Sequence, residues 1–68
     1  MTEYEKQVAQ MAAGARMMTH ERLVHTAEWC QRIILAATDR SAPDIQQVRL
    51  VAGIVAAELG ARAHAAGK

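Results

Sequence analysis

Phenylalanine is absent from this chain, and cysteine, proline, tryptophan and tyrosine each occur only once. The single thiol of Cys30 excludes a disulfide within the chain, and no paired cysteine or histidine spacing predicts a structural zinc site. Chains this short usually need a disulfide, a structural metal or a second subunit to fold stably. The lack of a disulfide and of a zinc site therefore favours oligomerisation. With 68 residues we expect one helical domain, residues 1–68, and no cofactor.

Long hydrophobic runs and blocks of one charge are missing too. The longest apolar run, residues 50–57, includes Gly53 and is far shorter than the ~20 residues that span a bilayer. The chain opens with Glu3 and Glu5 instead of the basic and then apolar start of a secretion signal. We therefore expect a cytoplasmic protein that does not enter a membrane. The net charge is +1 and the arginines are scattered along the chain, so charge alone does not indicate which class of partner the chain binds.

Helix-forming residues dominate what is present, and no strand-like alternation competes with them, so the sequence predicts an all-α fold. The clearest boundary lies at Ser41, which with Asp44 three residues later is typical of a capping box, while Pro43 suits a first helical turn. Two long helices, about 20–38 and 42–66, are joined there by a few residues. They should form an antiparallel helical hairpin.

The N-terminal part repeats apolar residues in the same helical rhythm, but the phase shifts between Met18 and Leu23. One interpretation is a single helix that continues through residue 19, since a strict 3.6-residue period keeps a second set of apolar residues in line. The other is a break near residue 19, with Thr19 capping a new helix, which Gly14 also favours. The break would give three helices, about 3–18, 20–38 and 42–66.

The last predicted helix carries more apolar surface than one neighbour can cover. The stripe that we assign to the hairpin consists of Ile45, Val48, Ala52, Val55 and Leu59. Further apolar residues extend past the ~100° arc of one packing partner, and small residues around Gly53 would let another backbone approach closely. We therefore predict a helical-bundle dimer. The residues expected to mediate self-association are Leu50, Val51, Ile54, Val55, Ala57 and Leu59.

Polar residues on the second predicted helix raise the question of metal or acid–base chemistry. Glu21 and His25 share a helical face, and Glu28 follows three residues later. A zincin motif needs histidines four residues apart, whereas His20 and His25 are five apart. The Glu-x-x-His order of carboxylate metal sites is reversed here. Cys30 lies within the apolar stripe and is interpreted as a buried thiol. We therefore expect no catalytic, cofactor or metal site and no enzyme activity.

The chain has two aromatic side chains, Tyr4 and Trp29. Aromatic and arginine side chains dominate binding hot spots, and Arg32 lies on the turn next to Trp29, so this region predicts a partner-facing patch. The alternative is that Trp29 only closes the hydrophobic core at the edge of the dimer. A cluster of flexible methionine side chains before residue 19 could change shape to fit a groove on a partner protein. The predicted partner-binding residues are Trp29, Arg32, His25 and Met18.

Residues 55–60 resemble the first helix and turn glycine of helix-turn-helix DNA-binding units, but only residues 61–68 remain for a recognition helix. The sequence favours a small non-enzymatic protein–protein interaction module. We expect a homodimeric modulator or inhibitor of another protein, of the kind that phages and mobile elements encode. The alternative is a small dimeric DNA-binding or transcription-regulating protein. The identity of the protein partner does not follow from the sequence.

Overall fold

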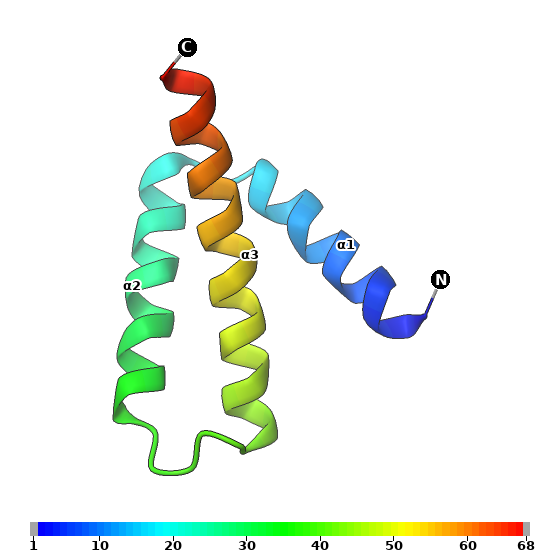
Figure 1. Ribbon diagram of the computed structural model, residues 1–68, viewed down its shortest axis with the longest axis vertical. Helices are drawn as coiled ribbons and strands as arrows, with labels where there is room; N and C mark the ends of the chain where they lie inside the picture. Colours follow the sequence, from blue (N-terminus) through cyan, green and yellow to red (C-terminus); the bar gives the residue numbers. More distant parts are fainter. Residues whose placement is uncertain (1, 68) are drawn as a thin grey trace.

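The computed structural model describes residues 2–67, which form three helices and no strand. The helices are α1 (Glu3–Arg16), α2 (His20–Ala36) and α3 (Pro43–Ala66). Helices α2 and α3 lie side by side and run in opposite directions, whereas α1 meets α3 near its own C-terminal end and diverges toward the N-terminus (Figure 1). The prediction of an all-α fold is confirmed. The helical structure is interrupted between Arg16 and His20, so α1 and α2 are separate helices.

The break between α1 and α2 is produced by local hydrogen bonds. The backbone N–H of Met17 donates to the carbonyl of Gly14 at 3.1 Å, which tightens the last turn, and α1 ends at Arg16, two residues before its predicted end. Thr19 then caps α2, because its hydroxyl accepts a hydrogen bond from the backbone N–H of Arg22 at 3.1 Å. The Thr19 cap is therefore confirmed.

The capping box predicted at the start of α3 is wrong. The hydroxyl and the backbone N–H of Ser41 both donate to Oδ1 of Asp39, at 2.6 and 3.0 Å, so a local turn takes the place of the cap. These bonds, the hydroxyl bond first, lower the pKa of the exposed Asp39 carboxyl because they favour its charged form. Ala42 precedes the helix without a side-chain cap, and Pro43 occupies the first turn as expected.

The core is small and lies where the three helices meet. Among residues 2–67, the buried apolar side chains are Ala15, Leu23, Cys30 and Val55. Around Ala15, Leu23 and Val55, partly buried side chains of the link between α1 and α2, of α2 and of α3 complete the cluster: Met18, Ala27, Val51, Ile54 and Leu59. Leu23 and Cys30 belong to the stripe predicted for the second helix, and both are buried as expected.

The molecule is thin for its size. It measures 40 × 31 × 16 Å, and its radius of gyration is 12.9 Å, compared with about 11 Å for a compact domain of this length. Helix α3 is central, because both other helices pack mainly on it. No helix within residues 2–67 is long and apolar enough to cross a membrane.

Candidate interaction surfaces

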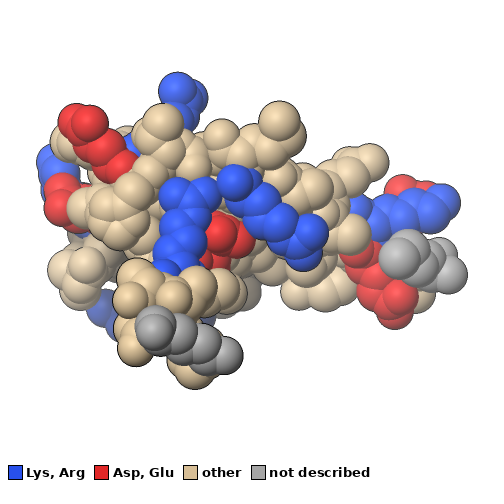
Figure 2. Space-filling view, turned by 90° about the horizontal axis from the view of Figure 1, so that it is seen from above, with Lys and Arg blue, Asp and Glu red and all other residues tan. Residues whose placement is uncertain are grey.

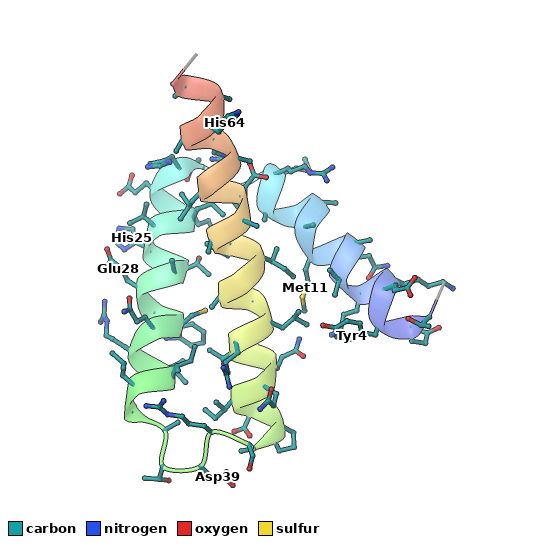
Figure 3. The ribbon with its side chains drawn as sticks, in the orientation of Figure 1. Tyr4, Met11, His25, Glu28, Asp39 and His64 are labelled. Carbon is teal, nitrogen blue, oxygen red and sulfur yellow. The ribbon has the colours of Figure 1, made fainter. Side chains whose placement is uncertain are left out.

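The polar side chains considered for metal binding lie on the exposed side of α2. His25 Nε2 is 3.9 Å from Glu21 Oε1, and Arg32 Nη2 is 3.9 Å from Glu28 Oε2, with all four side chains exposed. Figure 3 shows His25 and Glu28 pointing away from α3. In the part of the chain that the structure describes, no three His, Cys, Asp or Glu side chains come together as metal ligands would. These contacts are exposed intrahelical pairs of little energetic weight.

Cys30 is fully buried on α2, with an exposed fraction of 0%. Burial raises the pKa of its thiol, because desolvation disfavours the thiolate. The side chain therefore behaves as a small apolar core residue, as the sequence predicted.

Arg62 makes the polar contact that joins α3 to the end of α1, and no sequence motif pointed to it. Its Nη2 donates to the carbonyl oxygens of Met18 at 2.7 Å and Arg16 at 3.1 Å, and more weakly to that of Ala15 at 3.4 Å. Its Nε donates to Oε2 of Glu58 at 2.9 Å, and the two side chains are 28% and 18% exposed. Since the last carbonyls of a helix lack partners within it, Arg62 caps the C-terminal end of α1.

Part of the α3 surface that the sequence pattern left for another chain is covered by this chain itself. Val55 is 3% exposed, so its side chain already belongs to the core. Leu50 is half-buried, and Ala57 is exposed. Of the predicted self-association residues, Ala57 is thus the one that stays exposed. The remaining three pack partly against the core, where the three helices meet: Val51, Ile54 and Leu59.

Two open grooves run along α3. The groove between α3 and α1 has a volume of about 520 Å³, and its apolar lining includes Val8, Ala12, Leu50, Gly53 and Ala57. The groove between α3 and α2 has a volume of about 410 Å³, and its lining includes Ala27, Leu35, Ala52 and Ala56. Both grooves therefore border the exposed side of α3.

A larger hollow of about 610 Å³ lies where the three helices meet. Its lining includes the methionine cluster predicted as an adaptable surface: Met11, Met17 and Met18. Figure 3 shows Met11 on the side of α1 that is turned toward α3. Such flexible thioether side chains can repack around an apolar ligand or a partner side chain.

The predicted partner-binding residues of α2 share one exposed side of that helix. His25, Trp29 and Arg32 follow each other at intervals of four and three residues, which places them on adjoining turns. Trp29 is 57% exposed, and the His25 and Arg32 side chains are exposed beside it. Met18 instead lies between α1 and α2 and packs against the core. We call His25, Trp29 and Arg32 the α2 patch.

The accessible surface is large for a chain of this mass. The chain exposes 5125 Å², whereas folded monomers of 7.4 kDa typically expose about 4,200 Å². The difference of about 900 Å² is close to the roughly 800 Å² that each partner buries in a standard protein–protein interface. The exposed large apolar side chains are Tyr4, Met17, Trp29 and Leu35. The chain therefore buries less of its surface than a typical monomer of its mass.

The resemblance of residues 55–60 to a helix-turn-helix unit does not hold. Helix α3 continues unbroken from Pro43 to Ala66, so Gly60 lies inside a helix and not in a turn. On the face seen in Figure 2, basic and acidic side chains lie next to each other along the molecule, and no extended block of one sign forms. This face lacks the dense positive footprint that phosphate binding usually leaves.

Comparison with models of known protein families, with curated proteins and with solved structures finds no match for this chain.

Proposed function

We propose that this chain is a non-enzymatic protein–protein interaction module that forms a helical-bundle homodimer and binds a further protein. The observation that supports this best is the accessible surface of 5125 Å², about 900 Å² more than a monomer of this mass normally exposes. Hairpins of α2 and α3 from two copies would bury that surface and enlarge a core that is small in one chain.

Two separate surfaces support the two roles. The exposed side of α3, with Ala57 and beside it the half-buried Leu50, is available for self-association. The α2 patch offers an exposed tryptophan beside an arginine, the combination that dominates binding hot spots. A cytoplasmic module of this kind acts by occupying the surface of its partner as a modulator or inhibitor, in the manner of phage and mobile-element accessory proteins.

Self-association is tested by thermal unfolding, followed by circular dichroism over about a hundredfold range of protein concentration. A homodimer that unfolds to single chains has a Tm that rises with concentration, by mass action. A Tm that is the same at every concentration would contradict the homodimer.

Binding of a further protein is tested by affinity capture from the native host with three forms of the chain. Trp29→Ala removes the centre of the α2 patch, and Tyr4→Ala removes a similarly exposed aromatic side chain of α1 as the matched control. We expect a protein that the wild type and Tyr4→Ala retain and that Trp29→Ala loses. A protein retained equally by all three forms would contradict the role of the patch.

A further inference from the structure

We infer that the second copy in the proposed homodimer inserts its own helix α1 into the wedge between α1 and α3. The two α1 helices lie antiparallel around a two-fold axis, with Glu5 of each copy against Arg16 of the other. This inference rests on the proposed homodimer and specifies which helix forms it and which charges align it.

The wedge opens because α1 diverges from α3 toward the N-terminus (Figure 1). Arg62 holds only the C-terminal end of α1, through hydrogen bonds to carbonyl oxygens there. Farther from that contact, Val8 and Ala12 of α1 are half-buried and line the groove of about 520 Å³. Leu50 and Ala57, the α3 positions available for self-association, line the same groove, and no described residue of α2 contributes to it. The groove therefore has an apolar wall on each of two helices and room for side chains between them.

Two arginine side chains that line the groove have no acidic partner. Within residues 2–67, neither Arg16 nor Arg49 forms an ion pair. The carboxylate in the lining, that of Glu58, is already paired with Arg62 at 2.9 Å. An occupant that brings an acidic side chain therefore complements the groove better than an uncharged or a basic one.

Helix α1 itself carries the complementary charge. Four of its residues fall within an arc of about 80° and form what we call the α1 row: Glu5, Val8, Ala12 and Arg16. Glu5 is exposed in the first turn and forms no ion pair within the described part of the chain. It lies 11 residues, about 16 Å, from Arg16 along the helix, so the two cannot pair within one chain. The row thus has an acid at one end, a base at the other and apolar side chains between them.

The α1 row is complementary to an antiparallel copy of itself. A two-fold axis level with residue 10 places Val8 of one copy against Ala12 of the second copy, because both positions lie two residues from that level. The same axis brings Glu5, five residues before the level, beside Arg16 of the second copy, six residues beyond it. The mismatch of one residue is about 1.5 Å, which a long arginine side chain spans. An isologous interface requires this kind of self-complementarity, and each dimer gains two ion pairs.

The pairing is tested by reversing each charge separately and then mixing the two variants, with sedimentation equilibrium of the full chain as the measurement. In the homodimers, Glu5→Arg places two bases against each other and Arg16→Glu places two acids against each other. Because the two-fold axis repeats the contact, we expect each reversal to raise the dimer Kd at least about tenfold. An equal mixture restores both attractive pairs in a heterodimer, whose Kd should return to within about threefold of the wild-type value.

Glu3→Arg is the matched control. It reverses the other acidic residue of the first turn, so it has the same net charge as Glu5→Arg and the same effect on the start of the helix. Glu3 lies about 160° from Glu5 around the helix, on the side turned away from the α1 row. The control should dimerise like the wild type, and it should bind Arg16→Glu no more tightly than it binds itself.

The mixture distinguishes a contact between chains from damage within one chain. A substitution that only weakens α1 stays weak in the mixture, whereas a reversed contact between copies recovers. A wild type that sediments as a monomer would overturn the homodimer and the α1 pairing together. A wild-type dimer that both reversals leave intact, or reversals that the mixture does not rescue, would overturn the α1 pairing alone and leave the wedge to an acidic helix of another protein.

Discussion

Replacing Arg62 with alanine removes the side chain that fixes the end of α1 to α3. The change deletes the 2.7 Å hydrogen bond to the Met18 carbonyl and the 3.1 Å bond to the Arg16 carbonyl. It also leaves the Glu58 carboxylate, which is 18% exposed, without its 2.9 Å partner. The interface between α1 and α3 therefore loses its polar contact and keeps only its apolar one.

The magnitude follows from these contacts. A hydrogen bond from a charged group contributes about 1.5–3 kcal/mol, and we count the short, partly buried bond to Met18 in full. The bond to Arg16 is exposed and the ion pair with Glu58 is partly screened, so together they add at most about 1 kcal/mol. We expect the free energy of unfolding to fall by about 1.5–4 kcal/mol. That is a large fraction of the roughly 3–10 kcal/mol that stabilises a chain of 68 residues.

The assay is urea unfolding followed by circular dichroism at one fixed protein concentration, together with amide hydrogen exchange of α1. Arg32→Ala is the matched control, because Arg32 makes only an exposed 3.9 Å pair with Glu28 and its loss should change stability by less than about 0.5 kcal/mol. In Arg62→Ala the amides of α1 should exchange faster than those of α2. Equal stability of the two variants, with unchanged exchange in α1, would show that the Arg62 contacts do not hold α1 against α3.

Three further predictions concern other parts of the chain. The Cys30 thiol should resist a thiol reagent in the folded protein and react once urea unfolds it, because it is fully buried and burial raises its pKa; fast labelling of the folded protein would contradict this. Because the folded-state pKa of Asp39 is lowered, its stabilising effect is present above the ordinary carboxyl pKa and is lost as the pH falls through the lowered value. Unfolding curves of the wild type should therefore approach those of Asp39→Ala at acid pH, and a constant difference would argue against the turn. Purified protein should not retard DNA on a gel, and strong retardation at low salt that is lost at high salt would favour a DNA-binding function.

The helices could be predicted because their signals are local. Apolar spacing predicted the buried positions of Leu23 and Cys30, and the hydroxyl of Thr19 predicted the start of α2. The cap at Ser41 failed for a local reason as well. The Asp39 carboxylate competes for the same hydroxyl, and the capping pattern alone does not show which partner wins.

The packing of α1 on α3 could not be predicted, because it depends on residues far apart in the sequence. Arg62 and Met18 are separated by 44 positions. No sequence pattern indicates which backbone carbonyl oxygens a single arginine near the end of an alanine-rich helix will contact. For the same reason, apolar spacing alone assigned Val51 and Ile54 to another chain, although α1 folds back toward them. Periodicity shows that a helix face is apolar, but it does not show which element covers it.

Sedimentation equilibrium of the wild-type chain at micromolar concentration measures whether two copies of the chain associate. If the excess surface of about 900 Å² forms an interface with a second copy, the mass should approach twice 7.4 kDa and fall on dilution. A stable, cooperatively folded species of 7.4 kDa at every concentration would contradict the account.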